Sequence, residues 1–280
     1  MNLSSGSAVA DLTLGAGGHA ELVLQASAPD GVLIGFDRDR SELAATEQRL
    51  QQFANRMELI GGNFATAPTL LKEMGATRLD GVLMDLGVSS MQLDDAGRGF
   101  SFREDGPLDM RMDQRRGKPA SDLIRRLPEE ELARIIFEYG EETRARAIAR
   151  KIVEVRRRTK IKRTLEFAEL VRSVVRGRGR IHPATKTFQA LRMAVNGELD
   201  AVESVLPKIV DCMAESGRLV VISFHSLEDR IVKRFMKDEE TAGRAVVITK
   251  KPLLATKDEQ SRNRRSRSAK LRCLEWRSVA

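Results

Sequence analysis

Residues 11–20, Asp-Leu-Thr-Leu-Gly-Ala-Gly-Gly-His-Ala, decide the fold of this 280-residue chain. An apolar, β-branched run begins just before them at residue 9, and a helical pattern follows over residues 19–25. Glycines between a strand and a helix allow a sharp turn and let the backbone approach a ligand that a Cβ would exclude. We therefore predict a strand, a tight turn and a helix that together bind a nucleoside-type cofactor.

Asp37 ends the next apolar run, about 20 residues after the glycines, where a carboxylate suits the two hydroxyls of a ribose. The turn itself leaves alternatives open. Residues 15–20 align with the dinucleotide fingerprint G-x-G-x-x-A, they also fit the looser loop of S-adenosylmethionine enzymes, and a turn that binds nothing is a third interpretation.

Strand and helix patterns alternate through the first third of the chain. We predict strands at residues 9–14, 32–37, 57–61 and 79–86, with helices from residue 18, over 41–52 and over 67–74. This order predicts an α/β fold with a parallel, doubly wound sheet, whose ligands bind at the carboxyl ends of the strands. Asp85 lies at such an end.

The middle of the chain changes character. Residues 94–113 are rich in glycine and paired charges and contain Phe100 and Phe102, so they are either a functional loop or a structured connector. Helical spacing then runs to residue 175, with a helix start at Pro128. We expect a helical insert at 110–190 between two parts of the sheet domain, 1–109 and 191–280.

After the insert we predict a long helix over residues 187–214, with breaks at Gly197 and Pro207. A buried strand at 217–224 leads into a helix capped by Ser226. Closing strands are expected at 245–249 and 271–276.

Charge is unevenly distributed along the chain. Residues 1–109 have a net charge of −8, whereas 110–190 have +11 and 244–280 have +8. The basic segments at 156–163, 176–180 and 262–272 predict contacts with a polyanion, most simply nucleic acid, although part of the excess is solvated helix surface.

Cysteine and histidine usage indicates neither a disulfide framework nor a metal site. Cys212 and Cys273 are isolated, and His19, His182 and His225 are scattered along the chain. Because no apolar run reaches membrane-spanning length and the N-terminus does not resemble a signal peptide, we expect a cytoplasmic protein without a membrane partner.

Several motifs together resemble one known family. They are Leu-Gly-Ala-Gly-Gly-His (14–19), Gly-Phe-Asp-Arg-Asp (35–39), Met-Asp-Leu-Gly-Val-Ser-Ser (84–90), Gly-Arg-Gly-Phe-Ser-Phe (97–102), Gly-Pro-Leu-Asp-Met-Arg-Met-Asp (106–113), Tyr-Gly-Glu-Glu (139–142), Ala-Thr-Lys-Thr-Phe-Gln-Ala-Leu-Arg (184–192), Ser-Phe-His-Ser-Leu-Glu-Asp-Arg (223–230) and Arg-Ser-Arg-Ser-Ala-Lys (265–270). In this order they resemble the ribosomal RNA small subunit methyltransferase H family, also called MraW, over nearly the whole chain.

The resemblance implies a class I S-adenosylmethionine-dependent methyltransferase of Rossmann-like fold with an inserted helical domain. It implies methylation of the N4 amine of a cytidine in the decoding centre of 16S ribosomal RNA, with the small ribosomal subunit as partner and a homodimer as a candidate assembly. The cofactor residues that it implies are Gly17, Gly18, His19, Asp37, Phe64, Asp85 and Gln92.

The chemistry adds candidates of its own. The cytosine N4 lone pair is delocalised into the ring, so an acceptor such as Asp85 is needed to orient the amine and stabilise its developing charge. We expect Phe100 or Phe102 to stack on the base. Further candidates for the base pocket are Asp109, Arg111, His225 and Ser226, of which Asp109 and Arg111 can alternatively pair with each other and His225 can be a structural helix-start residue.

Members of that family usually have a further N-terminal segment before the first strand, with a His-x-Pro-Val type motif, whereas Met1 here lies only a few residues before it. We therefore expect this difference to bear on closure of the cofactor pocket and on full activity. Two other functions remain as alternatives: a catalytically silent RNA-binding or assembly protein, and a nicotinamide-dependent oxidoreductase.

Overall fold

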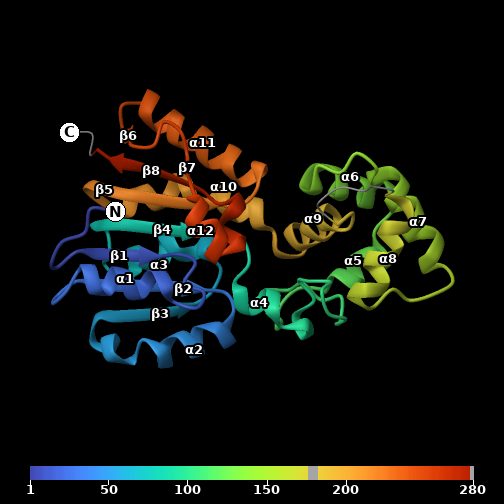
Figure 1. Cartoon of the computed structure of the whole chain (residues 1–280). Helices are drawn as coiled ribbons and strands as arrows, with labels where there is room; N and C mark the ends of the chain where they lie inside the picture. The colour runs from blue at the N-terminus through green and yellow to red at the C-terminus, as the bar shows by residue number, and fades with distance from the viewer. Residues whose placement is uncertain (176–181, 278–280) are drawn as a thin grey trace. The chain divides into compact units, whose positions relative to one another are not determined.

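The computed structural model describes residues 1–175 and 182–277, which form two compact units. Met1–Gly87 and Leu199–Ala280 make up the sheet unit, and Val88–Glu198 make up the helical unit (Figure 1). The helical unit begins earlier than residue 110, because Phe100, Leu108 and Met110 pack into its hydrophobic core.

The sheet unit contains one eight-stranded sheet in the order β3-β2-β1-β4-β5-β8-β6, with β7 paired to β8. The strands are β1 (Ala8–Asp11), β2 (Val32–Asp37), β3 (Met57–Gly61), β4 (Leu79–Asp85), β5 (Met213–Ser223), β6 (Ala245–Val247), β7 (Leu253–Leu254) and β8 (Lys270–Trp276). Strands β1 to β5 are parallel, and β8 is antiparallel to β5, β6 and β7. The predicted doubly wound α/β fold is confirmed, and β7 is the strand that the sequence did not predict.

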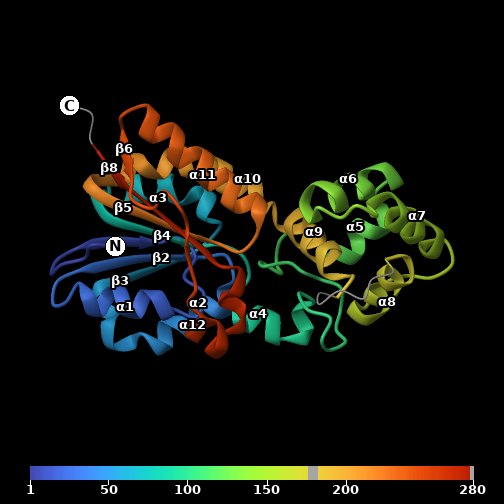
Figure 2. The same cartoon turned by 45° about the horizontal axis from the view of Figure 1, so that its top comes forward.

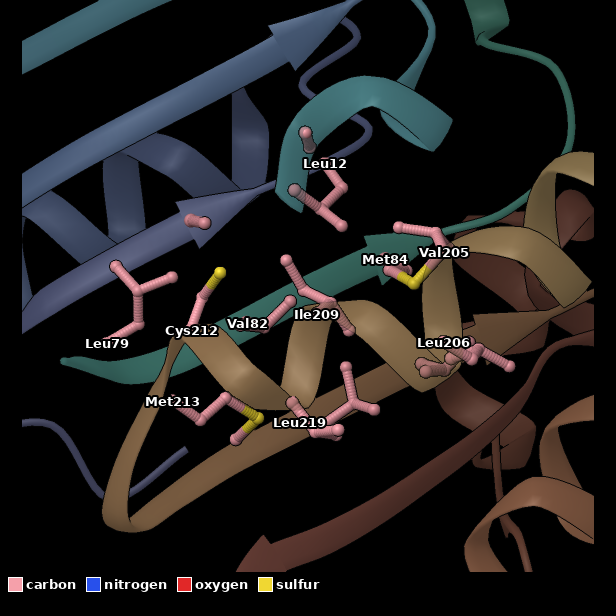
Figure 3. Close-up of a cluster of buried hydrophobic side chains, with 14 of the residues drawn as sticks. Leu12, Leu79, Val82, Met84, Val205, Leu206, Ile209, Cys212, Met213 and Leu219 are labelled. Carbon is pink, nitrogen blue, oxygen red and sulfur yellow. The ribbon is translucent and has the colours of Figure 1, made fainter. Parts of the chain in front are cut away.

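Helices cover both faces of this sheet (Figures 1 and 2). On one face, α1 (Gly18–Ala26) and α2 (Arg40–Arg49) pack with Val9 and Leu33. On the other, α3 (Ala67–Glu73), α10 (Glu198–Ile209) and α11 (Ser226–Thr241) contribute to the core that Figure 3 shows around Val82 and Met84. Side chains of a strand alternate between faces, so this core fixes the register of the sheet and the position of its carboxyl edge.

The long helix predicted over residues 187–214 is two helices, α9 (Thr185–Asn196) and α10. The break falls at Gly197, whose φ of 58° is in the left-handed region that ends helices. The predicted break at Pro207 is wrong, because α10 continues to Ile209. Pro207 removes one hydrogen bond near the helix end, whereas Leu206 and Ile209 are buried in the core and hold the last turn in place.

The helical unit is built from α4 (Ser90–Asp94), α5 (Ala120–Arg126), α6 (Glu129–Gly140), α7 (Ala145–Arg156), α8 (Thr164–Val174) and α9. Pro128 precedes α6 as predicted. A Cβ on Gly140 would lie 2.6 Å from the Lys186 carbonyl oxygen, so α6 and α9 approach each other as closely as backbones allow. The remaining short helices are η1 (Gln51–Arg56), η2 (Phe64–Thr66), η3 (Ala96–Arg98), η4 (Val210–Cys212), α12 (Lys257–Arg262) and η5 (Arg264–Ser268).

Residues 94–113, which we call the connector, are ordered by close backbone contacts. A Cβ on Gly99 would lie 2.1 Å from the Pro107 carbonyl oxygen, and one on Gly106 would lie 1.8 Å from that of Ala96. The Asn196 amide closes the other end, because it donates to the Met110 carbonyl and accepts from the Met112 N–H, each within 3 Å. The connector is therefore a packed structural element.

Over the described ranges, no helix is both long and apolar enough to cross a membrane.

Candidate active site

Asp37 holds the glycine turn in place. Its Oδ2 accepts a hydrogen bond from the Gly15 N–H at 2.7 Å, and its Oδ1 accepts from the Asp39 N–H at 2.8 Å. Burial raises the pKa of Asp37, and these two backbone hydrogen bonds act in the opposite direction. The carboxylate thus lies at the carboxyl end of β2, directly beside the turn that follows β1.

The two glycines that end the turn have different reasons to be glycine. Gly17 has a φ of 75°, and a Cβ there would lie 2.6 Å from the Thr46 methyl carbon, so folding itself requires glycine. A Cβ on Gly18 would meet no atom within 4 Å. The fold leaves Gly18 open at the N-terminus of α1, where backbone N–H groups can bind an anionic group of a ligand.

His19 and Asp85 approach each other beside the turn. The His19 Nε2 lies 3.6 Å from the Asp85 Oδ2, and about half of the His19 side chain is exposed. Hydrogen bonding with Asp85 raises the pKa of His19, and burial opposes this shift. The Thr13 hydroxyl accepts from the Asp85 N–H, which ties β4 to the end of β1.

Asp11 is the unexpected member of this group. It ends β1, is 1% exposed, and accepts from the Thr13 N–H at 3.0 Å through Oδ1. Among the residues that the structure describes, the Asp11 Oδ2 and the Asp85 Oδ1 are buried without a hydrogen-bond partner. Together with Asp37, they form an acidic cluster around the turn. Such a set of carboxylate acceptors fits a ligand that carries positive charge and N–H groups.

Phe64 and His225 follow two other strands of the same unit, β3 and β5, which are separated in the sheet by β2, β1 and β4. Phe64 begins η2 and is half-buried, three residues after β3, whose last residue pairs with Asp37. His225 follows β5. Its Nδ1 accepts from the Glu228 N–H at 3.3 Å, and its Nε2 lies 3.1 Å from the Glu228 Oε1.

This arrangement corrects the prediction for Ser226, because the N-cap of α11 is His225. The His225 imidazole accepts from the Glu228 N–H, which takes the capping role predicted for the Ser226 hydroxyl. The structural interpretation of His225 therefore has direct contacts in its favour.

The other predicted site residues belong to the helical unit. Gln92 and Ser89 form a capping box at the start of α4. Phe100 is 7% exposed, and the Arg98 guanidinium carbon lies 5.7 Å from its ring centroid. Phe102 is half-buried, with ring centroids of His182 and Phe188 at 4.7 Å and 4.6 Å.

Asp109 and Arg111 pair with each other through two hydrogen bonds of 2.8 Å and 2.7 Å. This pairing raises the pKa of Arg111. The interpretation of the two residues as a mutual ion pair is confirmed.

The three basic segments differ in the contacts that the structure shows for their side chains. In 156–163, Arg156 donates to the Ile124 and Leu127 carbonyls and Arg163 pairs with Asp105, so part of this charge is structural. Residues 176–180 lie outside the described residues. In 262–272, the exposed Arg264 and Arg267 line a cavity of about 500 Å³ together with Gln260.

Sequence reasoning did not assign a role to Asp11 or Thr13, although both lie in the stretch that decides the fold. The available signal was a charged residue at the end of an otherwise apolar strand, immediately before the glycines. A buried acid at such a position is uncommon unless something pairs with it.

A sheet in this strand order, with a glycine turn after β1 and an acid after β2, defines a Rossmann-like fold with its ligand site at the carboxyl edge. The acidic cluster beside the turn suits a positively charged cofactor, as an S-adenosylmethionine-dependent methyltransferase requires. The chain belongs to the MraW methylase family, whose model matches residues 1–277. This membership decides between the methyltransferase and the oxidoreductase, and S-adenosylmethionine is the cofactor.

Relatives share most of this chain. A protein named ribosomal RNA small subunit methyltransferase H from Geotalea uraniireducens is 49% identical over an alignment of 289 positions, which covers 97% of this chain and 93% of that protein. The protein of the same name from Synechococcus elongatus is 49% identical over 268 residues, which cover 95% and 86%. Among solved structures, Aeropyrum pernix fibrillarin with natively bound S-adenosyl-L-methionine aligns with a TM-score of 0.43 at 9% identity, over 97% of this chain and 67% of that chain.

Proposed function

We propose that this methyltransferase modifies ribosomal RNA of the small subunit, at the N4 amine of a cytidine in the decoding centre. The names of relatives at 49% identity support the substrate class. The observation that carries the chemistry is the Asp85 carboxylate at the end of β4, where Oδ1 has no hydrogen-bond partner among the described residues.

The residues proposed to hold the cofactor are Gly17, Gly18, His19, Asp37, Phe64, Asp85 and Gln92. Asp37 retains lone pairs for ribose hydroxyls beyond its two backbone bonds, since a carboxylate has about four acceptor sites. The open backbone at Gly18 and the first N–H groups of α1 suit the methionine carboxylate. Phe64 supplies an apolar face next to Asp37.

Asp85 has the central chemical role in this proposal. S-Adenosylmethionine, when bound, supplies an electrophilic methyl group. The Asp85 carboxylate accepts an N–H of the target amine, which holds the nitrogen lone pair in line and stabilises the positive charge that develops on N4. After transfer, Asp85 accepts the proton that N4 loses.

Stacking on the base remains a prediction, and Phe102 is its better candidate. Phe100 is nearly fully buried in the helical core, whereas Phe102 is only half-buried. Replacing Phe102 with Leu keeps the apolar packing against His182 and Phe188 and removes the flat ring. Unchanged methyl transfer in this variant would refute the stacking role.

Phosphate contacts are proposed for Arg264 and Arg267. Both residues line one cavity, and neighbouring arginines can bind phosphate through several directed hydrogen bonds. The net charge of +8 on residues 244–280 supports a polyanionic ligand at this part of the chain.

Transfer of a labelled methyl group from S-adenosylmethionine to small ribosomal subunits that lack the modification tests the proposal. We expect transfer by the wild-type protein and by Asp30→Ala, an exposed matched control, and loss of transfer in Asp85→Ala. Cofactor binding without transfer to any ribosomal substrate would instead favour the catalytically silent RNA-binding protein. Homodimer formation is a separate prediction, which the molar mass in solution tests.

A further inference from the structure

Asp11, the acid at the end of β1, is buried with one carboxylate oxygen unpartnered among the described residues. Its carboxyl group is 1% exposed, and only Oδ1 is engaged, by the Thr13 N–H. Oδ2 is buried without a partner in the part of the chain that the structure describes. A buried carboxylate oxygen in this state is costly unless it is protonated or meets a cation.

The charged groups that face Asp11 come from all the elements around it. They are His19 at the start of α1, Asp37 at the end of β2 and Asp85 at the end of β4. Burial, reinforced by Asp85 and Asp37, raises the pKa of Asp11 to about 7, against the Thr13 N–H and His19. Three acids therefore share one histidine, and the cluster has an excess of negative charge.

We propose that Asp11 holds a proton in the cofactor-free protein and releases it when the positively charged cofactor binds, so that the site distinguishes cofactor from product by charge. The inference rests on the proposed placement of the cofactor at this edge of the sheet. It makes Asp11 a positioning and specificity-determining residue that senses the sulfonium.

The charge balance of the reaction gives this proton a role. During transfer the S–CH3 bond breaks, its electron pair stays on sulfur, and the new bond forms to the acceptor nitrogen, which then loses a proton. The bound ligand thereby loses one positive charge, as the sulfonium becomes a neutral thioether. Asp11 then takes up a proton from solvent, which restores the neutral buried state and removes its attraction for the spent ligand.

Calorimetry of the full chain measures this linkage directly. S-Adenosylmethionine and S-adenosylhomocysteine are titrated near pH 7 in phosphate and in Tris, whose ionisation enthalpies differ. For each ligand, the difference in binding enthalpy between the two buffers gives the number of protons released. Because Asp11 is partly protonated near its pKa of about 7, we expect a fraction of a proton released with the sulfonium and close to none with the thioether. Equal proton release by the two ligands would overturn the inference.

Two variants assign the proton. Asp11→Asn should abolish the difference in proton release between the two ligands, whereas His19→Gln, which removes the imidazole and leaves the Asp11 carboxyl group in place, should preserve it. The reverse pattern would transfer the role to His19 and refute the proposal for Asp11.

A measurement on the wild-type protein alone guards against a variant that does not fold. Affinity for S-adenosylmethionine should rise with pH through the range of Asp11, and affinity for S-adenosylhomocysteine should not. Identical pH profiles would refute the proposal. Absence of any S-adenosylmethionine binding would refute the placement of the cofactor as well, so the two failures are distinguishable.

Discussion

Replacing Asp11 with Asn should change how the stability of the sheet unit depends on pH. The folded protein binds the Asp11 proton more tightly than the unfolded chain, because burial raises the pKa from 3.8 to about 7. Folding therefore gains from this proton below pH 3.8, and the gain is lost as the pH rises through 7. At 1.36 kcal/mol per pKa unit, the wild-type protein loses about 4 kcal/mol relative to Asp11→Asn between about pH 4 and pH 8.

Urea unfolding followed by tryptophan fluorescence measures this difference. Trp276 is the single tryptophan and lies in β8, so the signal reports the sheet unit. The asparagine side chain also changes the free energy of unfolding by an amount that does not depend on pH. The test is therefore the pH-dependent part of the difference in free energy of unfolding between the two proteins. Asp30→Asn, at an exposed turn, is the control that should run parallel to the wild type. Parallel curves for Asp11→Asn as well would refute the account of Asp11.

Three further sets of variants test other parts of the account. Gly17→Ala places a side chain at positive φ and against α2, and should lower the free energy of unfolding by about 1–2 kcal/mol, whereas Gly18→Ala should leave stability unchanged and weaken S-adenosylmethionine binding in calorimetry. Equal effects of the two would contradict the distinction between them. Arg264→Ala and Arg267→Ala should each reduce the slope of log affinity for RNA against log salt by about 1 and leave cofactor affinity unchanged; an unchanged slope would exclude that cavity from RNA contact. Asn196→Ala removes the partner of two connector backbone groups and should destabilise the helical unit by about 1–3 kcal/mol. Faster hydrogen exchange in the connector would report this loss. Unchanged exchange would show that the glycine contacts alone hold the connector in place.

The parallel part of the sheet was predictable because most of its strands contain a short apolar run between turn residues. The bounds of β2 and β3 agree with those predicted, and the helix break at Gly197 was visible as a glycine within a long helical pattern. Pro207 was misleading, because packing of its neighbours into the core outweighed the local preference against proline. β7 has only two residues and no periodicity to detect.

The site was predictable only in part. A glycine turn and an acid at the next strand end are local signals, so Asp37 could be placed from the sequence. The state of Asp11 depends on Asp37 and Asp85, which lie 26 and 74 positions further along the chain and come together only when β1 pairs with β2 and β4. The N-cap of α11 is His225 and not the predicted Ser226, because the His225 imidazole accepts from the Glu228 N–H. Residue type alone does not reveal this geometry.

The central claim is tested most directly by the identity of the methylated nucleoside. Small ribosomal subunits from a strain that lacks the modification are incubated with the protein and labelled S-adenosylmethionine, and the nucleosides of the decoding-centre fragment are resolved by mass spectrometry. The account predicts N4-methylated cytidine in that fragment, absent with Asp85→Ala. Label on another nucleoside or in another fragment would contradict the proposed substrate, and no label despite measured cofactor binding would contradict the proposed activity.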